Sequence, residues 1–194
     1  KLAAMQIVSG MGTSVYRAAP ELFPLLAIKT LKITVKYGNS VYSTCVTYGG
    51  VGIMLCGVLG DIETGYAFGR LALDLVEKFN IKKTKARTWL IAWYNISPWK
   101  RHLRECVKPL LEVYKSGIET GDLDFAAVSA YTYSSSLIFC GIELEKVEEK
   151  FKLFAKAIKE INQVHIYNYH CMGYQVVLKL QGKSENPSEL MGLS

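Results

Sequence analysis

The spacing of glycine-containing turns constrains the fold of this chain more than any other feature. Gly38-Asn39-Ser40 precedes one long run of uncharged residues, and Gly121-Asp122 precedes another 83 residues later. The glycines that follow these runs, Gly57 and Gly141, lie 84 residues apart. A charged amphipathic pattern comes after each of them, and a further pair of helical patterns lies in between. Helix hairpins therefore recur about every 40 residues, which is within the range of helical solenoids.

Apolar residues along the chain recur at intervals of three and four, and no stretch shows the alternation of a strand. In the run after Gly141, for example, Val147, Phe151, Phe154 and Ile158 fall on one helical face. We expect about nine helices, at residues 3–17, 20–37, 41–58, 62–79, 82–96, 99–119, 123–140, 143–161 and 164–180. Pro109 lies inside the sixth helix and predicts a kink or a break near Glu105.

Polar residues before several of these runs are suited to capping. Asp61 and Asp122 precede the fourth and seventh helices, and we expect their carboxylates to accept backbone N–H groups there. Ser97 is the expected cap of the sixth helix. Gly57 and Gly60 are expected to form the turn between the third and fourth helices, with at least one of them at positive φ.

The third helix is uncharged, the seventh is uncharged after Asp124, and both are rich in small residues, whereas the fourth and eighth are charged and amphipathic. An inner solenoid helix touches the helices before and after it, so it must be small or apolar on most sides. Gly65 and Ala72 have the spacing of the small positions in the second helix of a TPR unit. These features predict an all-α, TPR-like helical-hairpin solenoid over residues 1–182, followed at 183–194 by a loop or the start of the next segment.

Several protein classes are disfavoured by composition. Residues 41–60 and 125–142 carry no charge, but their many glycines and hydroxyl groups suit a helical stack better than a membrane. Five cysteines without CxxC spacing argue against a disulfide framework or a zinc site and fit a reducing cytoplasm. The chain begins without Met, so we interpret it as part of a longer cytoplasmic protein.

Residue patterns for catalysis are absent from the sequence. No GK[ST] follows Gly10-x-Gly12, and the chain lacks HRD, DFG and GxSxG patterns. The three histidines, His102, His165 and His170, include no pair four residues apart, which a helical metal site would require. We therefore expect no catalytic, cofactor-binding or metal-binding residues in this segment, and neither ATP hydrolysis nor phosphate transfer.

Two groups of residues are candidates for binding. The net charge of +6 is concentrated between residues 82 and 108, where eight Lys or Arg face one acid, Glu105. Within this stretch Lys100, Arg101 and Arg104 are candidate anion contacts, although a solvated helix face explains the same pattern. Nucleic-acid binding there is a weaker alternative. The second group consists of tyrosines expected to line a concave face, or alternatively to pack in the core: Tyr131, Tyr133, Tyr167, Tyr169 and Tyr174.

The turn residues also support a resemblance to a known family. Four runs are similar to those of very large, mostly cyanobacterial signalling proteins: residues 36–40, 57–66, 117–122 and 182–187. Those proteins combine a serine/threonine kinase, an AAA/STAND-type ATPase, a TPR-like region, GAF sensors and often a histidine kinase. This chain resembles part of the helical region over nearly its whole length. The matching residues are turns and caps and carry no catalysis.

The resemblance implies a non-catalytic scaffold or relay that connects a nucleotide switch to sensor modules. Its partners would be other domains of the same chain or other proteins, and a homo-oligomer could form through the parent protein. ATP would bind only in neighbouring domains. The alternative is a sensor that binds a small molecule in a tyrosine-lined groove.

Overall fold

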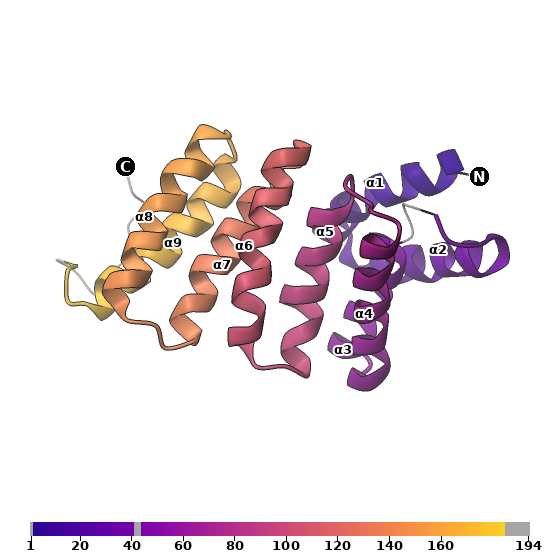
Figure 1. Cartoon of the computed structure of the whole chain (residues 1–194), viewed down its shortest axis with the longest axis horizontal. Coiled ribbons are helices and arrows are strands. Elements are labelled where there is room, and N and C mark those ends of the chain that lie inside the picture. Colours follow the sequence, from indigo (N-terminus) through magenta and orange to yellow (C-terminus); the bar gives the residue numbers. More distant parts are fainter. Residues whose placement is uncertain (1, 41–43, 185–194) are drawn as a thin grey trace. The chain divides into compact units, whose positions relative to one another are not determined.

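The computed structural model of the chain describes residues 2–40 and 44–184 (Figure 1). These residues form α-helices, short 3-10 helices and two π-helical segments, and no strand lies among them. The α-helices are α1 (Leu2–Ala18), α2 (Phe23–Tyr37), α3 (Gly50–Gly57), α4 (Ile62–Lys78), α5 (Lys85–Leu90), α6 (Leu103–Thr120), α7 (Leu123–Phe139), α8 (Leu144–Glu160) and α9 (Val164–Leu180). The predictions of an all-α chain and of about nine helices are confirmed for this part of the sequence.

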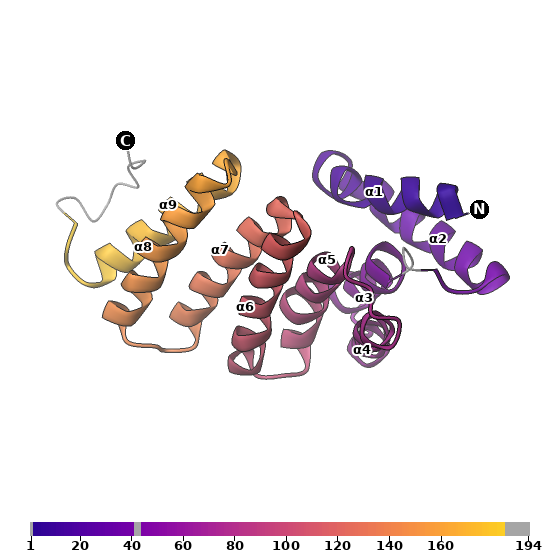
Figure 2. The same ribbon diagram turned by 45° about the horizontal axis from the view of Figure 1, so that its top comes forward.

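The helices form two compact units, residues 1–101 with α1–α5 and residues 102–194 with α6–α9. Within the units, α3 packs against α4, α6 against α7, and α8 against α9. Figure 2 shows α6, α7, α8 and α9 as successive neighbours. Such hairpins are consistent with the predicted solenoid. The assignment of residues 1–182 to a single repeat domain stays a prediction.

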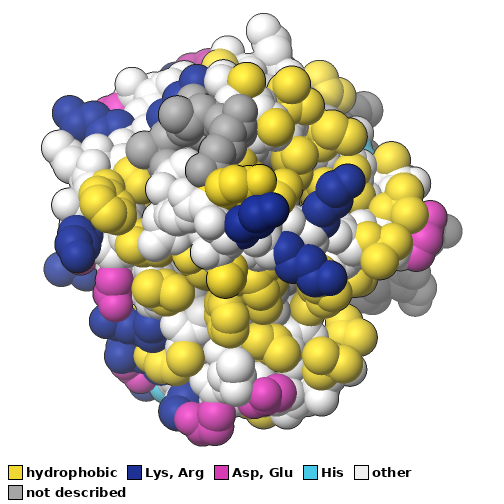
Figure 3. Space-filling view, turned by 90° about the vertical axis from the view of Figure 1, so that its right-hand side faces the viewer, with side chains coloured by type: hydrophobic (Ala, Val, Ile, Leu, Met, Phe, Trp, Pro, Cys, Tyr) yellow, Lys and Arg dark blue, Asp and Glu magenta, His cyan; other side chains and the backbone are white. Residues whose placement is uncertain are grey.

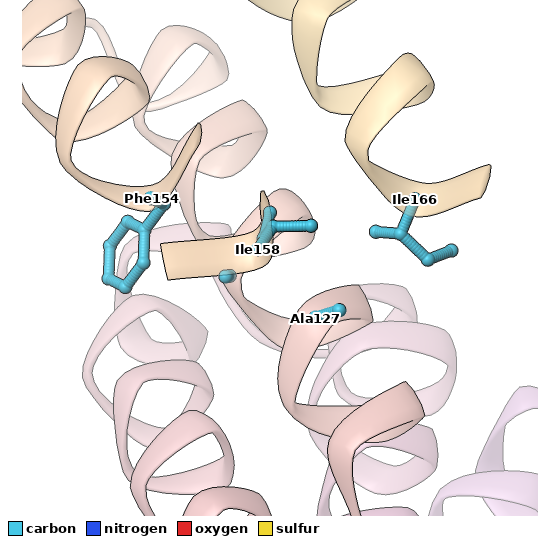
Figure 4. Close-up of a cluster of buried hydrophobic side chains, with 5 residues drawn as sticks. Ala127, Phe154, Ile158 and Ile166 are labelled. Carbon is cyan, nitrogen blue, oxygen red and sulfur yellow. The ribbon is translucent and has the colours of Figure 1, made fainter. Parts of the chain in front are cut away.

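The core of the C-terminal unit lies along α8. Val147, Phe151, Phe154 and Ile158 are all buried, so the predicted apolar face of this helix is confirmed. Figure 4 shows Ala127 of α7 and Ile166 of α9 in the same cluster as Phe154 and Ile158. Burial of large apolar side chains is the main stabilising contribution to such a unit.

Small residues bring α6 and α7 close together. A Cβ atom added at Gly117 of α6 would lie 2.9 Å from the Cβ of Ala126 and 3.0 Å from its backbone. The Ser129 hydroxyl donates to the Leu110 carbonyl across this contact, at 2.5 Å. Buried Ser134 and Ser136 donate to carbonyls within α7. These hydrogen bonds satisfy the hydroxyls inside the core, which explains how a serine-rich helix, charged only at Asp124 in its first turn, can be buried on most sides.

The N-terminal unit has two π-helical segments, Thr44–Gly49 before α3 and Ile91–Ile96 after α5. The second segment lies against two glycines, Gly49 at the end of the first segment and Gly52 of α3. A Cβ added at Gly49 would be 2.9 Å from Ile91 Cγ2, and one added at Gly52 would be 2.6 Å from Ile96 Cδ1. The sequence predicted ordinary helices at 41–58 and 82–96. The start of the first lies outside the described residues, and the second begins as an α-helix only at Lys85.

The expected start of the sixth helix at Ser97 and Trp99 is wrong. Ser97–Trp99 forms a 3-10 turn, and the Ser97 carbonyl accepts hydrogen bonds from the N–H groups of Lys100 and Arg101. The helix begins at Leu103, where the His102 side chain accepts the Arg104 N–H at 3.1 Å. Pro98 follows Ser97 and forms a separate short turn, so the cap shifts to the next residue able to accept a hydrogen bond.

Of the kink or break predicted near Glu105, the break does not occur: α6 continues through Pro109, and a kink stays a prediction. Proline removes one backbone hydrogen bond from a helix. Cys106, Leu110 and Val113 of α6 are completely buried on either side of it. The packing of this face against α7 keeps the helix continuous despite the missing bond.

The predictions for caps and turns are confirmed in part. Asp61 caps α4 by accepting the Thr64 N–H at 3.1 Å, whereas the Asp122 side chain makes no capping hydrogen bond to α7. Gly60 has a φ of +71° in the turn before α4, as predicted for one of the two glycines. Gly57 is the last residue of α3 and has no such conformation.

Candidate functional site

The five tyrosines predicted to line a binding face lie on two helices of the C-terminal unit. Tyr131 and Tyr133 belong to α7, and Tyr167, Tyr169 and Tyr174 belong to α9. These helices contact each other directly. The structure therefore brings the tyrosines into one neighbourhood, although they differ in how far they reach solvent.

Four of the tyrosines pack partly against the core, Tyr131 among them through the cluster around Phe154. The Tyr133 ring lies edge-on to Phe154 with ring centroids 5.5 Å apart, and burial raises the pKa of its hydroxyl. Tyr174 stacks on Phe151 at 6.2 Å. Tyr167 packs against the same cluster as Phe154, and its pKa is raised by a hydrogen bond with Cys171 and by burial. These side chains support the core as well as any surface function.

The solvent-facing part of the group is smaller. Tyr169 is exposed, and its ring lies 6.3 Å from that of Tyr131 and 4.9 Å from that of His165. This row of three rings is the part of the predicted tyrosine face that a partner or ligand could reach. Binding at this row stays a prediction.

His170 lies beneath the row and was considered from the sequence only as a metal ligand. Its side chain is 0% exposed, and Nε2 is 2.8 Å from the Phe151 carbonyl oxygen. The geometry assigns the proton to Nε2, which leaves Nδ1 as a buried acceptor without a hydrogen-bond partner. Burial lowers the pKa of His170, and the hydrogen bond to Phe151 opposes that effect. The ring is therefore neutral near pH 7.

A buried carboxylate fixes the end of α9. The Glu148 side chain on α8 is 9% exposed and forms ion pairs with Lys152 at 2.6 Å and with Lys183 at 2.5 Å. Hydrogen bonds from Lys152 and Lys183 lower its pKa to about 2. Lys183 follows the last turn of α9, so this pair of contacts ties that end of the helix to α8.

The predicted anion contacts in the N-terminal unit already have partners. Lys100 forms an ion pair with Glu63 of α4. The Arg101 Nε atom donates to the Tyr66 hydroxyl at 2.5 Å, and its guanidinium lies 5.9 Å from the Trp93 ring centroid. These contacts connect the turn after Ile96 to α4, and an anion would have to compete with them.

Arg104, in the C-terminal unit, also has an internal partner. Its Nε and Nη2 atoms both donate to the Cys140 carbonyl, at 3.1 and 2.7 Å. This carbonyl lies just after the last residue of α7, where helical carbonyls lack partners within the helix. Arg104 therefore closes the end of α7, and its role as an anion contact stays a prediction.

The α9 helix carries a surface feature that the sequence analysis missed. Tyr169, Met172, Val176 and Leu180 are between 40% and 59% exposed, and their spacing of three or four residues places them on one face of the helix. We call these four residues the α9 stripe. No Asp or Glu occurs in α9. The spacing is visible in the sequence, but the inner position predicted for this helix leaves no outer face for it.

The described residues form neither a metal-ligand cluster nor a membrane-spanning helix. Within residues 2–40 and 44–184, no three His, Cys, Asp or Glu side chains are grouped so that they could hold a metal ion. Among the helices of those residues, none combines the length and the apolar character needed to cross a membrane.

Comparison with known proteins gives one distant similarity. No protein-family profile matches the chain. Over 179 residues, which are 91% of the chain, it is 25% identical to part of "Hybrid signal transduction histidine kinase G" from Dictyostelium discoideum. The chain spans only 5% of the length of that protein. The similarity therefore connects nearly the whole chain with one segment of a much longer signalling protein.

Proposed function

We propose that this chain is a non-catalytic, TPR-like scaffold or relay segment of a multidomain signal-transduction kinase. The parent would carry serine/threonine or histidine kinase activity and an ATPase domain elsewhere, would act in the cytoplasm, and would supply any bound ATP. The similarity to a segment of a histidine kinase supports the signalling context.

The α9 stripe carries the proposal that the segment works through contacts. The four apolar side chains of the stripe are exposed to water, and covering them with another element would be favourable. A neighbouring helix of the same polypeptide fits the spacing, because helix faces pack through residues three and four apart. No acidic residue occurs in α9 and its one lysine, Lys179, lies in the last turn, so a covering helix would have few charges to desolvate.

The test uses the longer protein that contains this chain. Met172→Glu with Val176→Glu places two charges in the α9 stripe and should change the regulation of kinase autophosphorylation. The control is Phe139→Glu with Leu153→Glu, two more exposed apolar residues outside the stripe. The proposal requires a change in the first variant and none in the control. Equal autophosphorylation in both variants and the wild-type protein would contradict it.

A sensor that binds a small molecule is the second candidate. The orphaned Nδ1 of His170, whose ring lies 6.5 Å from that of Tyr131, is the observation that favours it. A planar aromatic ligand with a hydrogen-bond donor would suit a site with a ring row above a buried acceptor. Thermal-shift screening of such compounds with the wild-type chain and with Tyr169→Ala would detect it. Stabilisation that survives in Tyr169→Ala would show that the compounds bind elsewhere.

A further inference from the structure

The outward face of α2 combines apolar and basic side chains. Phe23, Ala27, Thr30 and Thr34 are buried on one side of this helix. On the opposite side Leu25 and Val35 are 65% and 78% exposed, and Ile28 is exposed as well. Lys29, Lys32 and Lys36 are exposed on the same side. We call these six residues the α2 face.

The α2 face has an internal order. With about 100° between successive residues of a helix, Ile28 and Val35 lie along one edge and Lys29 and Lys36 along the other, with Leu25 and Lys32 between them. The face is thus apolar along one edge and basic along the other, over roughly three turns of helix, with Lys32 lying between Ile28 and Leu25.

The charges of the α2 face are not neutralised by nearby acids. Glu21 is the only acidic residue in the first 60 residues of the chain. No ion pair is recorded for Lys29, Lys32 or Lys36 within the described residues, and the Lys36 ammonium lies 5.1 Å from the ring centroid of Tyr37. Figure 3 views the side of the N-terminal unit on which α1 and α2 lie and shows apolar side chains interspersed with Lys and Arg there.

We propose that the α2 face binds an amphipathic α-helix whose apolar stripe is bordered on one side by Asp or Glu. The partner's apolar stripe would cover Ile28, Val35 and Leu25. Its acidic border would meet Lys29, Lys32 and Lys36. Charge complementarity selects this partner from other apolar helices and sets its rotation on α2. The proposal goes beyond the role given to the α9 stripe and does not depend on it.

The experiment uses the whole 194-residue chain and two designed helical peptides of about 18 residues. The peptides share one Leu/Ile stripe and differ only in its border, which is Glu in one and Lys in the other. Fluorescence anisotropy at about 50 and 300 mM salt gives the affinities, since salt screens exposed charges. We expect the Glu-bordered peptide to bind at least about tenfold more tightly at low salt, with a smaller difference at high salt.

Two sets of variants locate the effect. Lys29→Glu, Lys32→Glu and Lys36→Glu together should reverse the preference between the peptides. The control Lys150→Glu, Lys156→Glu and Lys159→Glu makes the same change in net charge on α8 and should leave the preference unchanged. Ile28→Asp with Val35→Asp should abolish binding of both peptides. Equal binding of the two peptides, or equal effects of the α2 and α8 charge reversals, would overturn the proposal.

A membrane surface is the competing partner class. Vesicles with about 30% phosphatidylserine provide that arm, because anionic lipid attracts basic segments. Vesicle binding that depends on the three lysines, without discrimination between the peptides, would replace the helix with a lipid surface and overturn the proposal. None of these probes or variants involves α9, so their failure would leave the proposed scaffold function to be judged by its own test.

Discussion

The two units reach close helix packing with different residues. In the C-terminal unit, α6 and α7 approach through Gly117 and Ala126, and buried hydroxyls bond within the helices. In the N-terminal unit, Ile96 of a π-helical segment lies against Gly52 of α3 and Gly69 of α4. The first arrangement keeps every helix regular. The second depends on segments that depart from the α-helical repeat, and π-helical segments are rare in proteins and often occur at functional sites.

This difference in packing predicts that each unit is destabilised by a different kind of substitution. Side chains of α8 and α9 fill the C-terminal core, so a cavity there should affect mainly that unit. The glycine contacts of the N-terminal unit leave no space for added atoms, so it should be sensitive to enlargement.

Phe151→Ala should have the largest effect. Phe151 is completely buried in the core of the C-terminal unit, and truncation of a buried Phe typically costs about 3–5 kcal/mol. We expect amide hydrogen exchange to become faster in α7, α8 and α9 while the amides of α4 keep their protection. Equal loss of protection in both units would show that they unfold together and would weaken the comparison.

Gly65→Ala tests the N-terminal unit by enlargement. An added Cβ would lie 2.5 Å from Cys56 Sγ and 2.9 Å from the Gly52 carbonyl oxygen, so α3 and α4 would have to separate. We expect a loss of about 1–3 kcal/mol in the free energy of unfolding, measured by urea titration. Gly57→Ala is the matched control, because no atom lies within 4 Å of its added Cβ. The control should be neutral or slightly stabilising. Similar losses in both variants would refute the close contact.

Gly60→Val should cost about 1–2 kcal/mol. The φ of +71° at Gly60 disfavours a side chain, and a β-branched one most of all. From the sequence we expected at least one of Gly57 and Gly60 to have a positive φ, and the helical conformation of Gly57 places the strain at Gly60. Gly57→Val should therefore melt well above Gly60→Val. The reverse order would place the turn elsewhere.

His170 should make the C-terminal unit sensitive to mild acid. Its pKa is lowered in the folded state, so the unfolded chain binds more protons as the pH falls through the ordinary histidine value near 6.5. Stability contributed by the neutral ring is present above that pH and is lost below it. Melting curves between pH 7.5 and about 5.5 should show a decrease in the wild-type chain and a smaller one in His170→Gln. His165→Gln, on the exposed side of α9, should keep the wild-type dependence; an unchanged slope in His170→Gln would contradict the assignment.

Local signals allowed much of the C-terminal unit to be predicted from the sequence. The bounds of α9 agree with the expected range of residues 164–180, and α7 ends one residue before its predicted end. The apolar face of α8 was visible as a spacing of three and four residues. These features depend on residues close together in the sequence, which pattern analysis can detect.

The N-terminal unit departs from the prediction where distant residues decide the structure. The π-helical segment Ile91–Ile96 has an apolar pattern like that of an α-helix, and only its packing on Gly49, Gly52 and Gly69 distinguishes it. The cap of α6 is His102 and not Ser97, because a turn comes first. That turn is stabilised by the hydrogen bond from Arg101 to the Tyr66 hydroxyl, 35 residues away in the sequence. No local pattern contains that contact.

The candidate surfaces were predicted less well than the helices. The sequence left open whether the five tyrosines line a face or pack in the core, and the structure packs Tyr131, Tyr133, Tyr167 and Tyr174 partly against core clusters. Lys100, Arg101 and Arg104 were identified from local charge, whereas their partners lie 35 to 37 residues away. Charge counts show where basic residues lie in the sequence. They do not show which basic side chains already bind another side chain or a carbonyl.

Thiol labelling of Val176→Cys tests most directly whether the segment works through contacts. The variant places a thiol within the α9 stripe, and Leu153→Cys on α8 is the control. Labelling rates at these two positions would be compared between the 194-residue chain alone and the longer protein that contains it. A neighbouring helix on the stripe predicts labelling at residue 176 at least about tenfold slower in the longer protein, with an unchanged rate at residue 153. Equal rates at residue 176 in the two proteins would contradict the proposed role.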